Sequence, residues 1–182
     1  MGMKHRLHIA VFTLLALLAC EKKAPHPPQE GVTLDQASIQ VHFSPGGTPT
    51  AALVGVLNDA NESVLVQAYS FTSAPITDAL VHAHRRGVKV AVVLDKSHRA
   101  AKNSSTSILQ GAGIPVWIDE KHAIAHNKVM VIDGRVVVTG SFNFSKAAEE
   151  RNAENMLIIT NRRLAGIYTS YWESHREHSV NF

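Results

Sequence analysis

Two short apolar runs joined by Asp133-Gly134 constrain the fold of this chain more than any other stretch. Val129–Ile132 precedes the dipeptide and Val136–Val138 follows it. Asp-Gly between apolar runs is a strong signal for a β-hairpin, because both residues accept the positive φ angles that tight turns require. The sequence therefore predicts an antiparallel pair of strands here, and a sheet that is not purely parallel.

Polar side chains flank this predicted hairpin on both sides. His126 and Lys128 are two residues apart, so in an extended chain they point the same way. Ser141 and Asn143 are also two apart beyond the return strand, and their hydroxyl and amide groups can donate hydrogen bonds. Each residue alone suits an ordinary strand or turn. Together, an imidazole, an ammonium and two neutral donors indicate a site that attacks and binds an anion.

The spacing His-x-Lys-(x)4-Asp followed by Gly-Ser-x-Asn resembles the HKD motif of the phospholipase D superfamily. The neighbouring segments FSPGGT, AYSFTS, TGSFNFSKAAE and RNAEN resemble the short bacterial endonucleases of that superfamily, which carry a single motif. The resemblance extends from about Gln40 to the C-terminus and has many fixed positions, so it is far more specific than a lone glycine motif. It implies a hydrolase that cleaves phosphodiester bonds.

The resemblance also implies roles for individual residues. His126 would form a covalent phosphohistidine, and Lys128 would neutralise the phosphate oxygens. Asp133 belongs to the motif, although its position equally suits the turn alone. Glu154 falls where a carboxylate orients the imidazole in this superfamily, and is otherwise a surface carboxylate. The predicted phosphate-binding residues are Lys128, Ser141 and Asn143.

No metal ligands are expected from the spacing of the 11 histidines. His82 and His84 are two apart on a predicted helix and cannot share a face. His122 and His126 are four apart but lie outside any predicted helix, and no carboxylate cluster accompanies either pair. The sequence therefore predicts a metal-independent enzyme without a cofactor.

The stoichiometry of the motif predicts an oligomer. In-line displacement at a phosphodiester needs a nucleophile on one side and a general acid on the other. The chain has one His-x-Lys sequence, and the imidazole of His126 cannot occupy both places. We therefore expect a twofold homodimer with a shared active site, as the resemblance also implies.

Two substrate classes remain open, with a non-specific endonuclease acting on DNA or RNA as the first expectation. Five cations in the loops around the motif suit backbone contacts, and each is equally well a solvated charge: Lys96, Arg99, Lys102, Lys146 and Arg151. The alternative is a phospholipase D acting on membrane phospholipids, although no aromatic or apolar loop in the sequence suggests entry into a bilayer. A non-catalytic binding protein is disfavoured, since it has no need of His126 together with Glu154.

The N-terminus predicts export. A basic segment, Lys4-His5-Arg6, precedes the apolar run Ile9–Ala19 and then Cys20, which resembles a bacterial lipoprotein signal. Lipidation of Cys20 would tether the protein to the periplasmic side of the outer membrane. The alternative is ordinary signal cleavage, which would leave the protein soluble in the periplasm or secreted, with Cys20 an unpaired thiol if it is retained. Without Lys4 and Arg6 the formal charge falls from +3 to +1, which gives no general argument for nucleic acid. The expected organisation is a signal peptide at 1–20, a flexible tether at 21–37 and a phospholipase D-like domain at 38–182.

Helical and strand patterns alternate through this domain. Helices are expected after Thr48 and Ser73, around Ser107–Gln110, and along the amphipathic segment Leu164–Trp172. Besides the hairpin, strands are expected at Gln40–Phe43, Val64–Tyr69, Val88–Leu94, Ile114–Ile118 and Asn155–Thr160. The pattern predicts an α/β sandwich, a mixed β-sheet flanked by helices.

Overall fold

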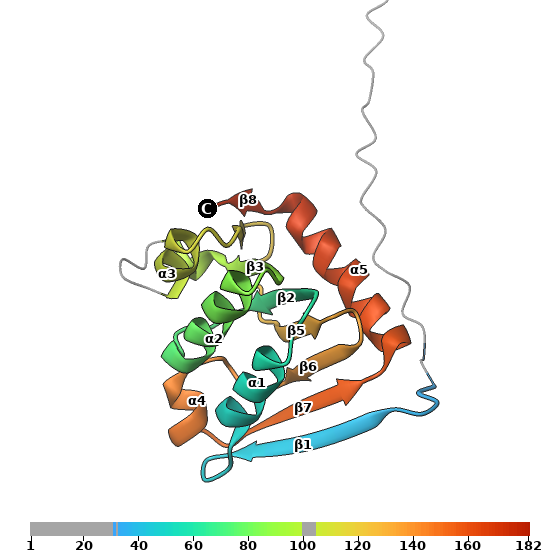
Figure 1. Cartoon of the computed structure of the whole chain (residues 1–182). Helices are drawn as coiled ribbons and strands as arrows, with labels where there is room; N and C mark the ends of the chain where they lie inside the picture. Colours follow the sequence, from blue (N-terminus) through green and yellow to red (C-terminus); the bar gives the residue numbers. More distant parts are fainter. Residues whose placement is uncertain (1–30, 32, 100–104) are drawn as a thin grey trace, which may run out of the picture.

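The protein is a single mixed sheet with helices on both faces (Figure 1). The computed structural model describes residues 31, 33–99 and 105–182. The predicted signal segment with Cys20, most of the predicted tether, and Lys102 lie outside the described residues. Within those residues, no helix has both the length and the apolar character needed to cross a membrane.

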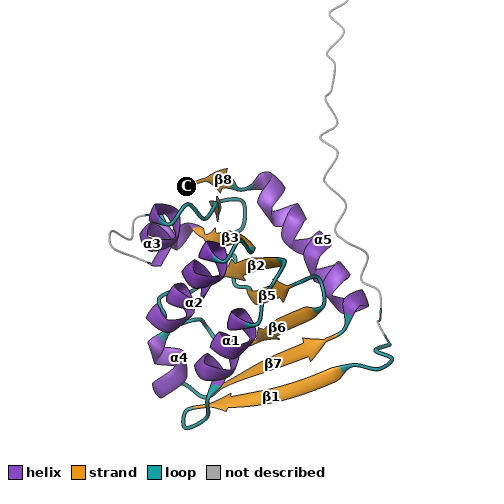
Figure 2. Cartoon of the chain, viewed as in Figure 1, coloured by secondary structure: helices purple, strands orange, loops and turns teal. Residues whose placement is uncertain are grey.

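The sheet has eight strands in the order β1-β7-β6-β5-β2-β3-β4-β8 (Figure 2). The central strands β2, β3 and β4 are parallel, and all other neighbours are antiparallel, so the predicted mixed sheet is confirmed. The strands are β1 (Ser38–Ser44), β2 (Ser63–Ala68), β3 (Lys89–Asp95), β4 (Val116–Asp119), β5 (Lys128–Ile132), β6 (Val136–Gly140), β7 (Glu154–Thr160) and β8 (Val180–Asn181).

Helices cover the two faces of the sheet unequally. They are α1 (Pro49–Asn58), α2 (Ala74–Arg85), α3 (Ser105–Gly111), α4 (Lys146–Glu150) and α5 (Arg162–His178), with a short 3-10 turn, η1 (Lys96–His98). The larger core lies between the sheet and α1 and α2, and the smaller core lies under α5. Alternation along β5 supplies both, because Met130 faces the larger core while Val129 and Val131 face α5. The sequence did not predict α4 or β8.

The predicted hairpin is confirmed as β5 and β6, with Ile132 opposite Val136. Asp133 and Gly134 adopt φ angles of 51° and 56°, as the turn requires. These angles are easy for glycine and acceptable for aspartate, so the local sequence is sufficient to form the turn.

Both helices predicted to begin after Thr48 and Ser73 do so, but neither side chain forms the expected capping hydrogen bond. At α1 the free backbone N–H of Thr50 donates instead to the Glu149 carboxylate from α4, at 3.0 Å. A charged acceptor from another element has replaced the local hydroxyl, which ties α1 to α4.

All of the predicted catalytic and phosphate-binding residues except Asp133 lie along the side of the sheet where strands begin or end, which we call the motif edge. Five strands end at the motif edge, namely β1, β2, β3, β4 and β6, and two begin there, namely β5 and β7. The register shows this directly, because Ala68 lies opposite Lys128, Ser44 opposite Glu154, and Asp95 opposite Asp119. Strand ends are where loops can present polar side chains without breaking the core.

Candidate active site

His126 lies exposed in the loop just before β5. Its ring packs against Tyr69, with centroids 4.7 Å apart and planes inclined by 51°. The next residue, Asn127, is held to β2 and its extension, because its carbonyl accepts from the Tyr69 N–H at 2.9 Å and its side chain from Gln67 at 3.2 Å. The end of β2 thus places the imidazole while leaving it open to solvent.

Lys128 is the first residue of β5, and its side chain is buried. Its ammonium donates to the His126 carbonyl at 2.9 Å and lies 5.2 Å from the centre of the Tyr69 ring. Burial lowers the pKa of Lys128, and the negative charge of Glu154 opposes this shift. The ammonium is therefore held by a carbonyl and an aromatic face, and no carboxylate bonds to it directly among the residues that the structure describes.

Ser141 and Asn143 follow β6 at the same edge. The Ser141 hydroxyl oxygen accepts from the Asn155 backbone N–H at 3.0 Å, so its own hydrogen is free to donate. The buried Oδ1 of Asn143 has no hydrogen-bond partner in the part of the chain that the structure describes. Oδ1 can only accept a hydrogen bond, so the group of this amide that can donate to a phosphate oxygen is Nδ2.

Glu154 begins β7 and is half-buried. It accepts a hydrogen bond from Asn152 at 3.0 Å, and its charge acts on Lys128. No contact with the His126 ring appears among the interactions of the described residues. The structure thus brings Glu154 to the site on the Lys128 side, and its predicted bond to the imidazole stays a prediction.

Asp133 does not join the site, which corrects its predicted catalytic role. It lies beyond the far end of β5, a strand of five residues, roughly 15 Å from the motif edge. Its carboxylate accepts from the backbone N–H groups of Asn61, Glu62 and Ser63 at 2.8 to 3.2 Å. Burial raises the pKa of Asp133, but these hydrogen bonds outweigh burial and lower it overall. Asp133 anchors the start of β2 to the hairpin turn.

The cations predicted to contact a nucleic-acid backbone are mostly engaged elsewhere. Arg99 pairs with Glu120 at 2.8 Å, and Lys146 lies 3.6 Å from Glu150. Lys96 donates to the His122 carbonyl at 3.1 Å, and Arg151 is exposed after α4. These contacts favour the interpretation of the described cations as surface charges.

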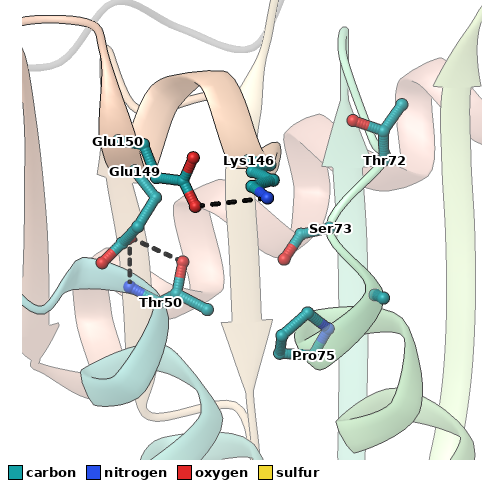
Figure 3. A pocket seen from close by; sticks show the side chains of 8 residues that line it. Thr50, Thr72, Ser73, Pro75, Lys146, Glu149 and Glu150 are labelled. Carbon is teal, nitrogen blue, oxygen red and sulfur yellow. Dashed lines mark hydrogen bonds and ion pairs between the residues drawn. The ribbon is translucent and has the colours of Figure 1, made fainter.

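A pocket of about 370 Å³ lies beside the site, among α1, the start of α2 and α4 (Figure 3). Thr72 and Ser73 form one wall, and their backbone N–H groups both donate to the Phe144 carbonyl at 2.9 Å. Lys146, one of the cations predicted to contact a nucleic-acid backbone, lines it, but none of the predicted catalytic or phosphate-binding residues does. The pocket therefore neighbours the loop after Asn143 without being part of the predicted phosphate site.

The sequence did not identify three features of this edge. Tyr69 contacts both His126 and Lys128, and its only signal was its position at the end of a buried strand. Asn155 holds Ser141, although the same asparagine was assigned only to a strand. The prediction that ligand-type residues do not cluster is wrong, because Asp119 gathers three histidines from two distant segments: His122, His175 and His178.

The fold and site define a phospholipase D-type phosphodiesterase, and the comparisons agree. The family model described as cardiolipin synthase, PLD-like domain, matches residues 53–176. The chain therefore belongs to the phospholipase D superfamily, and it is a hydrolase of phosphodiester bonds.

Individual relatives include proteins named phospholipase D or cardiolipin hydrolase and two solved structures named Nuc and NucT. A phospholipase D of Rickettsia typhi is 43% identical over 150 residues, covering 82% of this chain and 74% of the relative. A mitochondrial cardiolipin hydrolase of Xenopus laevis is 34% identical over 68% of this chain and 60% of its own length. The crystal structure of Nuc, a phospholipase D family member from Salmonella typhimurium, aligns with a TM-score of 0.76 and 35% identity, over 81% of this chain and 99% of Nuc. NucT from Helicobacter pylori aligns with a TM-score of 0.74 and 27% identity, over 81% of this chain and all of NucT.

Proposed function

We propose that this protein is a phospholipase D that hydrolyses the bond between the phosphate and the head-group alcohol of membrane phospholipids. The observation that carries this proposal is its similarity to five Rickettsia proteins named phospholipase D, at 41 to 44% identity over at least 75% of this chain. The nucleases of the same fold are 35% and 27% identical. The lipid alternative is thus better supported than the endonuclease expected first.

The surface beside His126 also supports a lipid substrate. The sequence suggested no apolar loop there, but Ile124, two residues before His126, is 57% exposed. A branched apolar side chain next to an exposed imidazole suits contact with a lipid surface, where its transfer from water is favourable. This single apolar side chain weakens the argument that no apolar surface lies near the predicted site.

The proposed reaction proceeds in two displacements. A nitrogen of His126 attacks phosphorus, the bond from phosphorus to the head-group oxygen breaks, and a second imidazole protonates that oxygen. Lys128, Ser141 and Asn143 stabilise the charge on the non-bridging oxygens. Water, deprotonated by the second imidazole, then attacks the phosphohistidine, releasing a phosphomonoester and restoring His126.

The second imidazole is proposed to be His126 of another copy of this chain. A stripe on β1 offers a surface for that copy, because Ile39, Val41 and Phe43 alternate along the strand and are 52%, 52% and 64% exposed. They lie on the same face of the sheet as α5. That helix packs mainly over β2 to β6, so it leaves β1 uncovered. The stripe ends at the motif edge, where Phe43 lies opposite Asn155. Burying it in a twofold interface would bring two sites together.

The location is also proposed. Lipidation of Cys20 after export would hold the domain on the periplasmic side of the outer membrane, next to phospholipid. Cys20 is the only cysteine of the chain, so the modification can be tested cleanly. Metabolic labelling with a radioactive fatty acid should mark the wild-type chain and leave Cys20→Ser unlabelled; label on both chains would contradict lipidation.

Side-by-side turnover tests the substrate class. The full chain would be incubated with vesicles of phosphatidylcholine and phosphatidylglycerol, and separately with plasmid DNA and single-stranded RNA. We expect release of the head-group alcohol from vesicles, reduced by about 1,000-fold or more in His126→Ala. The control His82→Ala changes an exposed histidine of α2 and should retain wild-type turnover.

An endonuclease is the second candidate, favoured by the alignment of this chain with nearly all of Nuc at 35% identity. Cleavage of DNA or RNA that needs His126, with intact vesicles under the same conditions, would replace the lipid proposal with this one. Turnover of neither substrate class by folded wild-type protein would contradict both.

A further inference from the structure

A compact cluster of ligand-type side chains lies at the motif edge and includes His122 from the loop that carries His126. Asp119 ends β4, His122 follows in the next loop, and His175 and His178 lie one turn apart at the end of α5. Oδ2 of Asp119 lies 2.7 Å from Nδ1 of His175, 2.9 Å from Nδ1 of His122 and 3.3 Å from Nε2 of His178. One ligand atom from each of the four lies within 4.8 Å of the others.

The crowding exceeds what a buried aspartate needs for hydrogen bonding. Three imidazoles converge on a single carboxylate oxygen, and their ring centroids are only 4.7 to 5.2 Å apart. The side chains of Asp119 and His175 are 0% and 5% exposed, whereas those of His178 and His122 are 22% and 39% exposed, so the cluster is buried around Asp119 and open to solvent at His122. Three charged imidazoles this close would repel one another, whereas neutral imidazoles present lone pairs to a cation.

We propose that Asp119, His122, His175 and His178 bind one divalent transition-metal ion, for which Zn²⁺ is the best match. Three imidazole nitrogens and one carboxylate oxygen form a tetrahedral ligand set typical of zinc, whereas Mg²⁺ and Ca²⁺ prefer oxygen ligands. Ligands about 2.05 Å from a tetrahedral ion lie roughly 3.3 Å from one another. Of the three separations from Asp119 Oδ2, the 3.3 Å to His178 matches this spacing, while the 2.7 and 2.9 Å to His175 and His122 are hydrogen-bond distances that would lengthen slightly around an ion.

The surroundings of Asp119 orient it for this role. Its other oxygen, Oδ1, accepts from the backbone N–H groups of Lys121 at 3.1 Å and His122 at 3.3 Å. These bonds leave Oδ2 directed at the histidines, as supporting contacts commonly do for metal ligands. Four protein ligands close the coordination sphere, which is typical of a structural ion and leaves no position for substrate.

The ion would fasten the loop that carries His126. This loop leaves β4 at Asp119, is held midway where the Ala125 N–H donates to Asp95 at 2.8 Å, and reaches β5 at Lys128. A metal bridge from its first residues to α5 would fix one end of the loop, while Asn127 fixes the other. The site is independent of which phosphodiester His126 cleaves.

Metal titration of the untagged full chain tests this inference. The protein would be stripped with a chelator and dialysed, then titrated by calorimetry with Zn²⁺ and with Mg²⁺, and with Co²⁺ by visible absorption. We expect one Zn²⁺ per chain, tetrahedral Co²⁺ bands, and no response to Mg²⁺. His122→Gln and His178→Gln should each weaken Zn²⁺ binding by more than about 100-fold. This loss is larger than that expected from removing a residue that only hydrogen-bonds to a metal ligand.

Two controls separate this site from the other histidines. His82→Gln, on the exposed face of α2, and His126→Ala, in the active site, should both bind Zn²⁺ as wild type does. Because the ion binds only the folded state, Zn²⁺ at about 100 times its Kd should raise the wild-type Tm by roughly 5 to 10 °C and leave that of His178→Gln almost unchanged.

Three results would overturn the inference. They are wild-type protein that takes up no Zn²⁺ at millimolar concentration, variants of the cluster that bind it as tightly as wild type, and loss of binding in His126→Ala. A destabilised His178→Gln together with a wild type indifferent to Zn²⁺ would also overturn it, since the cluster would then be a hydrogen-bond network alone.

Discussion

His126 is held by a neighbour rather than by its own strand. Tyr69 packs on its ring and lies under the Lys128 ammonium, so one aromatic side chain contacts both of the predicted reactive groups. No hydrogen bond of the Tyr69 hydroxyl appears among the described interactions. The contacts that the structure shows for the Tyr69 side chain are made by its ring.

Removing that ring should therefore slow turnover. Aromatic and cation–π contacts contribute about 0.5 to 2 kcal/mol each, so Tyr69→Ala should lower kcat about 10-fold or more. Tyr69→Phe keeps the ring and should retain most of the activity. Steady-state kinetics on both variants would check this, and equal losses in the two would show that the hydroxyl, not the ring, is required.

Asp133 is expected to stabilise the fold without affecting the chemistry. Asp133→Asn keeps a residue that tolerates positive φ but loses charge-assisted hydrogen bonds, so the free energy of unfolding should fall by about 1 to 3 kcal/mol. Activity per folded molecule should stay at the wild-type level. Urea unfolding and turnover measured on the same samples would check both statements; loss of turnover at full stability would return Asp133 to catalysis.

The stabilisation by Asp133 should depend on pH in a defined direction. The pKa of this carboxyl is lowered from 3.8 in the folded state, so its stabilising effect is present above that value and is lost as pH falls through the lower, folded pKa. The stability difference between wild type and Asp133→Asn should therefore be constant near neutrality and shrink below about pH 4. Asp78→Asn, an exposed site on α2, is the control, and a difference that grew in acid would contradict the assignment.

At the scale of elements, the approach of β6 to β7 depends on Gly140. Its φ is +148°, and a Cβ there would lie 2.3 Å from the Asn155 carbonyl oxygen. The same asparagine holds Ser141, so the contact that excludes a side chain also places the predicted phosphate donor.

Gly140→Ala should therefore damage both stability and activity. Overpacking and backbone strain together should cost about 2 to 4 kcal/mol of unfolding free energy, and Ser141 should be displaced. Gly55→Ala is the matched control, because that exposed position in α1 has nothing within 4 Å of a new Cβ and should become about 0.5 to 1 kcal/mol more stable. Denaturant melts of both variants check this; a neutral Gly140→Ala would mean that the strands separate easily.

At the scale of the whole molecule, a single chain supplies one His-x-Lys sequence to a proposed reaction that uses two imidazoles. If the proposed dimer forms the shared site, mixing wild type with His126→Ala before refolding should reduce activity as the square of the wild-type fraction. A linear decrease would indicate a self-sufficient monomer.

The apolar stripe on β1 is expected to hold this dimer together. Val41→Glu places a charge in its centre and should raise the dimer dissociation constant and lower turnover in parallel, measured by sedimentation and by dilution kinetics. Ile108→Glu is the control, since that residue is also 52% exposed but lies on α3. An active, monomeric Val41→Glu protein would contradict the shared site.

Much of the fold was predictable from short segments. The hairpin, the strands of the central sheet and the amphipathic final helix follow from hydrophobic period and from Asp133-Gly134, which act over a few residues. The pairing of His126 with Lys128 was also visible, because two residues at that spacing share a neighbourhood in any extended chain. The short elements α4 and β8 were not, since packing stabilises them more than their own sequence does.

Contacts between distant segments had to come from the tertiary structure. Only the sheet register shows that Asp133 lies far from His126, and only the packing of β2 brings Tyr69 onto the imidazole. Asp119 and His175 are separated by 56 residues, so no local spacing rule reveals that they touch. Hydrophobic periodicity depends on interactions between residues that are close in sequence, so it predicts single helices and strands. A site made of several strands and a helix forms only when those elements pack together.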